Sequence, residues 1–163
     1  MNTTRAQGLA VWVFLALLIA LADQGTKQFI GSWLAPGETR GVTGFFNLVL
    51  VLNRGAAFGF LSDAAGWQRE FFSGVALIAS ALIFALLWRR PGDRLFCAGL
   101  ALILGGALGN LWDRVALGHV VDFLDVHAFG YHWPAFNLAD SAITVGAALL
   151  ILDGFRTRTP PAG

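Results

Sequence analysis

Charged residues and cysteine are scarce in this chain. Only 13% of its 163 residues are charged, whereas 56% are hydrophobic. A soluble domain usually carries about 25% charged and about 45–50% apolar residues, and the mean hydropathy of +0.66 agrees with that deficit. Cys97 is the only cysteine, which excludes an intrachain disulfide and a thiolate metal cluster. A water-soluble core of this size cannot enclose so much apolar surface, so we expect lipid to cover much of it.

The sequence also has no run of lysine or arginine, and its net charge is only +1. A domain that follows the phosphates of a nucleic acid needs a basic patch or stripe. We therefore expect no nucleic-acid partner. There is no internal repeat and no low-complexity tract, so residues 1–163 are expected to form a single membrane-embedded domain.

Four apolar segments approach the length that a membrane crossing requires, which is roughly 20 residues with a range of about 17–25. The expected spans cover residues about 6–23, 69–88, 95–112 and 136–153. The first is apolar only over residues 9–22, so it must include flanking residues to reach across. Taken alone, this segment also resembles a secretory signal peptide with a cleavage site at residues 20–22. The three further spans favour interpreting it as the first of four.

Arginine is concentrated in three short segments, namely the N-terminal tail, the turn between the second and third spans, and the C-terminal tail. These segments hold Arg5, Arg89, Arg90, Arg94, Arg156 and Arg158. Dense lysine and arginine in short loops face the cytoplasm, so both termini are predicted to be cytoplasmic. Only two of the ten acidic residues, Asp93 and Asp153, fall on that side. Of the other eight, seven lie in the outer stretches 23–68 and 113–135 or just inside the fourth span, and Glu70 lies at the outer end of the second span.

The first outer stretch has features of a β-structure. Residues 44–52 are rich in β-forming side chains and bounded by turn residues, which predicts a strand or two within a stretch of about 38–60. The small residues at 55–59 suit a close approach of the backbone to another group.

Asp140 is the clearest ionisable residue within a span. Such a side chain at mid-helix costs about 2.5–3.5 kcal/mol on insertion scales and usually marks a functional site. Twelve residues separate Asp140 from Asp153. At about 1.5 Å per residue this is roughly 18 Å, which places Asp140 below the outer surface of a core about 30 Å thick. Asn137 precedes it by three residues, and Asn110 and Asp113 repeat this spacing near the outer end of the third span.

Each acidic residue has a structural alternative. Asp140 could cap the fourth helix by accepting hydrogen bonds from amides of its first turn. Asp23 could anchor a helix end, and Asp113 with Arg114 could pair charges at an interface. Asp125 resembles an ordinary solvated loop acid.

These alternatives do not explain why several carboxyl groups occur at one level of the membrane. Two carboxylates held close in a low dielectric cannot both ionise cheaply, so the pair shares a proton. The ionised partner can take a proton from water while the protonated one donates to a scissile carbonyl, which favours peptide hydrolysis. A proton- or cation-coupled transporter remains an alternative, because intramembrane acids also mark ion paths. A metal-dependent transferase, with Asp122 and Asp125 as ligands of a divalent cation, is a second one.

Five blocks of the sequence resemble the lipoprotein signal peptidases, also called signal peptidase II, and occur in that family's order across nearly the whole chain. They are DQGTK at 23–27, NRGAAFG at 53–59, GNLWDR at 109–114, VVDF at 120–123 and FNLADS at 136–141. The resemblance implies an intramembrane aspartyl endopeptidase that removes the signal peptide from bacterial prolipoproteins. Cleavage would occur before a cysteine that already carries diacylglycerol.

The same resemblance implies a catalytic pair, Asp122 and Asp140. Supporting or substrate-binding residues would be Asp23, Asn53, Asn110, Asp113, Arg114 and Asn137. Arg54 stands where the family often carries threonine or tyrosine, so no role is assigned to it. Because the pair activates water by itself, no metal or other cofactor is expected.

The fold implied is an all-α polytopic membrane protein with four transmembrane helices and a small extracytoplasmic β-cradle. It would lie in the bacterial cytoplasmic (inner) membrane as a monomer, with both termini cytoplasmic and the active site near the outer face. Its partners would be diacylglyceryl-modified prolipoproteins and membrane lipid.

Overall fold

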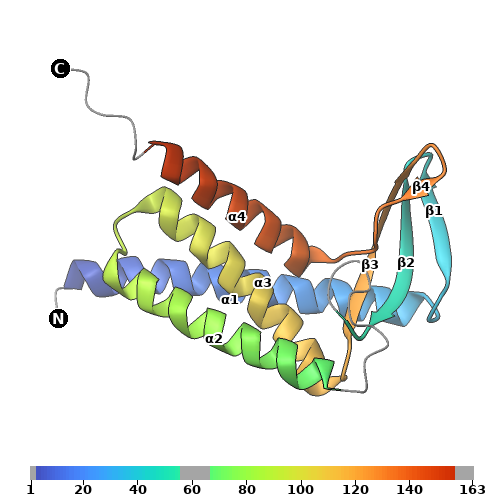
Figure 1. The fold of residues 1–163 in the computed structure, drawn as a ribbon, viewed down its shortest axis with the longest axis horizontal. Helices are drawn as coiled ribbons and strands as arrows, with labels where there is room; N and C mark the ends of the chain where they lie inside the picture. Colours follow the sequence, from blue (N-terminus) through green and yellow to red (C-terminus); the bar gives the residue numbers. More distant parts are fainter. Residues whose placement is uncertain (1–2, 56–66, 157–163) are drawn as a thin grey trace.

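The computed structural model describes residues 3–55 and 67–156, which form four long helices and one small sheet (Figure 1). The helices are α1 (Thr3–Trp33), α2 (Gln68–Arg89), α3 (Arg94–Ala116) and α4 (Leu138–Arg156). The strands are β1 (Thr39–Thr43), β2 (Phe46–Asn53), β3 (Val120–Ala128) and β4 (Tyr131–His132), in the order β1-β2-β3-β4. This architecture confirms the expected fold class.

All four helices are long and apolar enough to cross a membrane. Large apolar side chains such as Phe14, Leu21, Ile78 and Ile151 point outward with more than half of their surface exposed. In water so much exposed apolar surface would be unfavourable, whereas a helix surrounded by lipid is expected to present it.

Helix α3 lies at the centre of the bundle. Half of its most apolar window is buried, compared with 11–17% for the other three helices. Small residues allow α4 to approach it closely. A Cβ added at Gly99 would lie 2.8 Å from the carbonyl oxygen of Gly146, and one added at Gly106 would overlap the carbonyl oxygen of Ala139.

Helix α1 continues well beyond the predicted end of the first span at residue 23. The reason is that Asp23 and Lys27 pair with each other inside the bundle, at 2.8 Å, so the charges do not end the helix. The helix is also continuous through residues 20–22, and Ala16 belongs to the buried core. In the structure this segment is thus part of the first long helix, in the place expected for the first of four spans.

The sheet lies at the end of the bundle opposite the first residues of α1 and the last residues of α4 (Figure 1). Strand β2 pairs with β1 on one side and with β3 on the other, both antiparallel, as in the pairs Arg40↔Leu48 and Phe46↔Val126. The β-structure expected at residues 44–52 is present in the described part as the β1–β2 turn and β2. Residues 56–59 of the small-residue segment lie outside the described residues.

Strands β3 and β4 lie in the second outer stretch, for which the sequence pattern predicted no strand. Asp122 and Asp125 interrupt the apolar run of β3, and aspartate is depleted in strands. Pairing with β2, which is distant in sequence, overrides this local preference.

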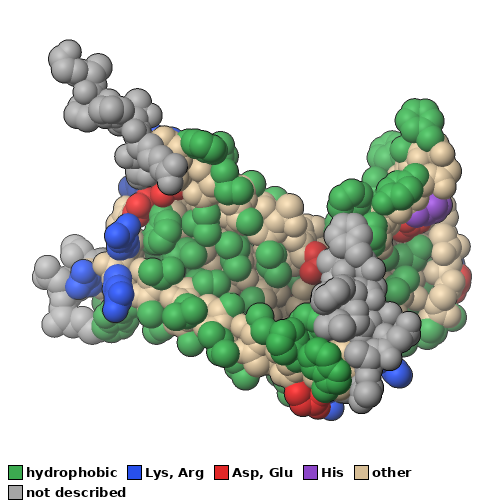
Figure 2. Space-filling view, viewed as in Figure 1, with side chains coloured by type: hydrophobic (Ala, Val, Ile, Leu, Met, Phe, Trp, Pro, Cys, Tyr) green, Lys and Arg blue, Asp and Glu red, His purple; other side chains and the backbone are tan. Residues whose placement is uncertain are grey.

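The charged side chains are distributed unevenly along the bundle. Figure 2 shows lysine and arginine side chains gathered at the end that is remote from the sheet. Arg5 donates a hydrogen bond to the backbone oxygen of Arg89 at 3.3 Å, which joins the start of α1 to the end of α2 there.

Candidate active site

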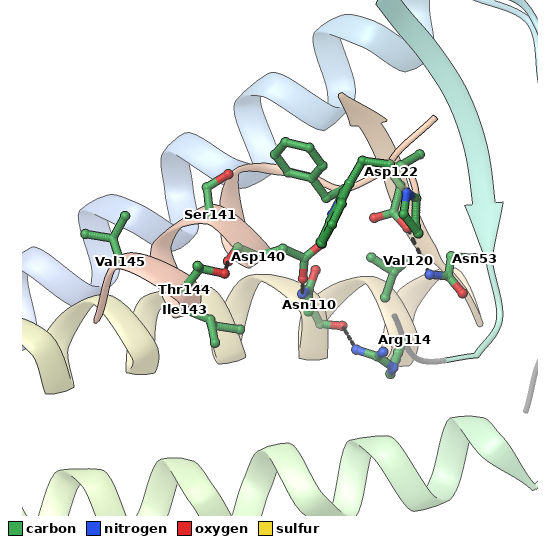
Figure 3. A pocket seen from close by; sticks show the side chains of 14 residues that line it. Asn53, Asn110, Arg114, Val120, Asp122, Asp140, Ser141, Ile143, Thr144 and Val145 are labelled. Atoms are coloured by element: carbon green, nitrogen blue, oxygen red, sulfur yellow. Dashed lines mark hydrogen bonds between the residues drawn. The ribbon is translucent and has the colours of Figure 1, made fainter. Parts of the chain in front are cut away.

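Asp122 and Asp140 come from different elements but line the same cavity. Asp122 is carried by β3 and Asp140 by the first turn of α4. The cavity, of about 660 Å³, lies where the bundle meets the sheet, and both side chains appear there in Figure 3. Three further residues that the sequence singled out, Asn53, Asn110 and Arg114, also line it.

The rest of the cavity wall is largely apolar. It is formed by α4 and by the segment that leads into it, including Trp133, Pro134, Phe136, Ile143 and Val145. The cavity thus places a polar cluster beside an apolar helix face.

Asn137 joins the two carboxyl groups. Its Nδ2 donates to Asp122 Oδ1 at 2.7 Å, and its backbone N–H donates to Asp140 Oδ2 at 3.3 Å. In return, Asn137 Oδ1 accepts from the backbone N–H of Asp140 at 2.9 Å. This reciprocal pair is a capping box at the start of α4. Asn137 is therefore the cap, and the alternative in which Asp140 itself caps the helix is wrong.

Asp122 is only 2% exposed and lies in an electrostatically mixed environment. Burial raises the pKa of Asp122 to about 7, because the charged form loses its hydration, and the nearby negative charge of Asp140 adds to the rise. Hydrogen bonds from Asn53, at 2.9 Å, and from Asn137 act in the opposite direction. The balance places the proton affinity of Asp122 in the range that acid–base catalysis at neutral pH requires.

A buried ionic cluster of Asp23, Lys27 and Asp113 lies next to the cavity but does not line it. Lys27 is 4% exposed, and its Nζ lies 2.8 Å from Asp23 Oδ2 and 2.9 Å from Asp113 Oδ2. The same ammonium group donates to Asn110 Oδ1 at 3.0 Å. Gly109 makes room for this cluster, since a Cβ there would lie 2.6 Å from Asp23 Oδ2.

The two acids of this cluster hold the elements that carry the cavity carboxyls. Asp113 Oδ2 accepts from the backbone N–H of Val121 at 3.0 Å, next to Asp122. Asp23 Oδ1 accepts from the backbone N–H of Ala139 at 2.9 Å, next to Asp140. Each acid therefore anchors the backbone of one cavity residue.

Arg114 extends from α3 to the edge of the cavity. It donates to the backbone oxygens of Asn110 and Gly55, both at 3.3 Å, and its guanidinium lies 5.3 Å from the ring centre of Phe72. The ion-pair partner of Asp113 is therefore Lys27 and not Arg114, its neighbour in the sequence.

The structure brings together all eight site residues that the sequence singled out. Asn53, Asn110, Arg114, Asp122 and Asp140 line the cavity, Asn137 lies between the two carboxyls, and Asp23 and Asp113 lie behind.

Lys27 is one residue of the site that sequence reasoning missed. A signal was available, because Lys27 follows Asp23 by four residues in one helix, and a lysine within a membrane span requires an acidic partner.

Asp125 is not a solvated loop acid, as its sequence context had indicated. It is 6% exposed and accepts hydrogen bonds from Asn47 Nδ2 at 2.7 Å and from His132 Nδ1 at 2.9 Å. Burial alone would raise the pKa of Asp125, but these two side chains outweigh it and hold the pKa below its usual value. Three residues apart on a strand, Asp122 and Asp125 face opposite sides of the sheet. They therefore do not converge on one cation.

A family model described as signal peptidase (SPase) II matches residues 15–156. The chain belongs to the signal peptidase II family. The lipoprotein signal peptidase of Cupriavidus necator is 59% identical over 146 residues, which cover 90% of this chain and 83% of that protein. The lipoprotein signal peptidase of Paraburkholderia phytofirmans is 57% identical over 156 residues, which cover 95% and 91%.

A solved structure shares the fold as well. A bacterial membrane enzyme whose structure was determined by the in meso method superposes with a TM-score of 0.79 at 30% identity and covers 94% of both chains. The chain described here is therefore a multi-pass protein of a bacterial membrane and an aspartic peptidase. Family membership thus decides against the transporter and the metal-dependent transferase.

Proposed function

We propose that the chain is a lipoprotein signal peptidase in which Asp122 and Asp140 hydrolyse the bond between a signal peptide and a prolipoprotein. One observation carries the assignment of these residues. Two carboxyl groups from separate elements open into one cavity and are bridged by a single residue, Asn137. The lipoprotein signal peptidases that are 57–59% identical to the chain support the substrate class.

In the proposed reaction a water molecule between the two carboxyls attacks the scissile carbonyl carbon. Asp140 takes a proton from this water, because burial raises the pKa of Asp122 to about 7 and makes Asp122 the partner that holds the shared proton. Asp122, with a pKa of about 7, donates its proton to the carbonyl oxygen. When the tetrahedral intermediate collapses, Asp140 gives its proton to the leaving amine and Asp122 recovers one from the hydroxyl group.

The surroundings of the pair suit a lipid-modified substrate. The cavity lies at the sheet end of the bundle, and its wall on α4 includes the apolar side chains of Ile143 and Val145. A cysteine that carries diacylglycerol would hold the adjacent peptide bond at headgroup depth while its acyl chains remain in lipid. We therefore assign cleavage to the bond before such a cysteine.

The proposed orientation places both termini in the cytoplasm and the cavity at the outer face of the bacterial inner membrane. Arg5, Arg89, Arg94 and Arg156 lie at the helix ends remote from the sheet, as the positive-inside rule requires of cytoplasmic ends. All proposed site residues come from one chain, so a monomer suffices for the reaction.

A cleavage assay with purified protein in detergent tests this assignment. The substrates are a diacylglyceryl-modified prolipoprotein and its unmodified form, each with and without a chelator. We expect cleavage of the modified form only, unaffected by the chelator, and complete loss of cleavage in Asp122→Asn and in Asp140→Asn.

The matched control is Asp125→Asn, which makes the same change on the same strand but on the opposite face of the sheet. It should retain cleavage. Wild-type rates in either Asp122→Asn or Asp140→Asn would refute the assignment, and inhibition by the chelator would point to a metal-dependent reaction instead.

A further inference from the structure

Lys27 forms one hydrogen bond in addition to the ion pairs that balance its charge. Its ammonium already has two carboxylate partners, Asp23 and Asp113, within 2.9 Å. The third partner is the neutral amide of Asn110, whose Oδ1 accepts a hydrogen bond from Nζ at 3.0 Å. Lys27 does not line the cavity itself. The contact with Asn110 therefore links the buried cluster to the cavity without bringing Lys27 into it.

The amide of Asn110 has a donor end and an acceptor end, and the two ends face different groups. Its Oδ1 faces donors only, because Asn137 Nδ2 also donates to it, at 3.2 Å. Its Nδ2 donates to Asp140 Oδ1 at 2.8 Å. A half-turn of this amide would set its NH2 group against the two donors and its oxygen against the carboxylate of Asp140.

We propose that Lys27 is a positioning residue, which fixes the amide of Asn110 so that Asp140 always faces an N–H donor. This inference rests on the proposed function, in which Asp140 is the general base. An N–H donor stabilises the ionised carboxylate, whereas an amide oxygen in the same place would stabilise the protonated acid. Through Asn110, Lys27 thus reinforces the preference for Asp140 as the carboxyl that accepts the proton from water.

The charges around the pair must be kept separate from this orienting effect. Lys27 on α1, Arg114 on α3 and Asp140 on α4 all act on Asp122 of β3. Removing Lys27 alone would change both the orientation of the amide and the local charge. The ion cluster, with two carboxylates and one ammonium, has a net charge of −1, which Lys27→Met would change to −2.

A double variant separates the two effects. Lys27→Met combined with Asp23→Asn leaves Asp113 as the one charged member, so the net charge of the cluster stays at −1. In the wild type the backbone N–H of Ala139 donates to Asp23 Oδ1 at 2.9 Å. The Asp23→Asn change keeps a side-chain oxygen that can accept this hydrogen bond. The double variant thus removes the ammonium donor from Asn110 at constant net charge, and Asn137 Nδ2 remains as the other donor to Asn110 Oδ1. It also removes the ion-pair partner of Asp113, and the Tm measurement reports the effect of that loss on stability.

The experiment measures kcat, KM, the pH dependence of kcat and Tm for the purified full-length variants in detergent. We expect Lys27→Met and the double variant to lower kcat by about 10–100-fold, as is typical when an orienting partner is lost. KM should stay near the wild-type value, because Lys27 does not line the cavity. The limb of the pH profile that reports the base should move to higher pH. Arg40→Met, which removes an exposed cation of β1, is the control and should keep the wild-type kcat.

A second variant covers the case in which the Lys27 variants do not fold. Asn110→Leu removes the N–H donor that faces Asp140 without adding a charge. It should reproduce the loss of kcat and the shift of the pH profile. An Asn110→Leu variant with the wild-type rate and profile would overturn the proposal.

Recovery of the wild-type kcat in the double variant would also overturn the proposal, since Lys27 would then serve only to neutralise Asp23. A lower kcat with an unchanged pH profile would do the same. The proposed function fails separately, through cleavage by Asp122→Asn or Asp140→Asn. If these two are inactive while the double variant is fully active, only the positioning role of Lys27 is wrong.

Discussion

Gly106→Ala tests how closely α3 and α4 must pack to hold the proposed catalytic pair. Alanine in place of a helix-interior glycine normally gains about 1 kcal/mol from helix propensity. At Gly106, however, the added Cβ would overlap the carbonyl oxygen of Ala139 and lie 2.8 Å from Ile143 Cγ1. The carbonyl oxygen of Ala139 belongs to the backbone, so it cannot rotate away as a side chain could. Overpacking of this kind costs about 1–3 kcal/mol, which cancels or outweighs the gain.

The effect on activity should be larger than the effect on stability. To restore ordinary contact, the start of α4 must retreat by roughly 1 Å, and a displacement of that size can lower a rate by about 100-fold. The residue displaced is Ala139, which directly precedes Asp140. We therefore expect a strongly reduced kcat together with an unchanged or lower Tm.

The assay measures kcat on the diacylglyceryl-modified prolipoprotein and Tm in detergent. Its matched control is Gly74→Ala on α2, where an added Cβ meets nothing within 4 Å. The control should cleave normally, with an equal or higher Tm. If Gly106→Ala showed the wild-type kcat and the same rise in Tm as the control, the reasoning about α3–α4 packing would be refuted.

Two further predictions concern Asp122. Because burial raises the pKa of Asp122 to about 7, ionising it in the folded protein is unfavourable. Tm should therefore fall as the pH rises from about 4, near the ordinary pKa of an aspartate, to about 7 and should level off above that, and Asp122→Asn should abolish that part of the fall in a thermal scan series. Asn53→Ala removes a hydrogen bond that lowers this pKa, so the limb of the kcat–pH profile that reports the acid should move to higher pH. An unmoved limb would show that Asn53 does not act on the proton of Asp122.

The helical part of the fold could be predicted because the membrane imposes strict demands on any segment that crosses it. Length and apolarity alone identify α2, α3 and α4. The sheet was harder, because β3 carries Asp122 and Asp125 and is paired with a strand far away in sequence. No local pattern reports such a pairing.

For the site, too, the local sequence pattern predicted some residues and not others. Asp140 was evident as an acid within a span, whereas its partner Asp122 was assigned from the family resemblance. The role of Lys27 was not visible, although its spacing from Asp23 was, because Asp113 and Asn110 reach it from a different helix. Contacts between distant segments, rather than residue types, were the missing information.

Asn137 serves both as the cap of α4 and as the hydrogen-bond donor to Asp122, so the start of the last helix and the bridge between the two carboxyls share one residue. During synthesis from the N-terminus, α1, α2 and α3 are made before Asp140 exists. The nascent chain then holds one carboxyl of the proposed pair and no partner for it. If Asp122 and Asp140 form the catalytic pair as proposed, the chain cannot hydrolyse a peptide bond until α4 has been inserted and packed against α3.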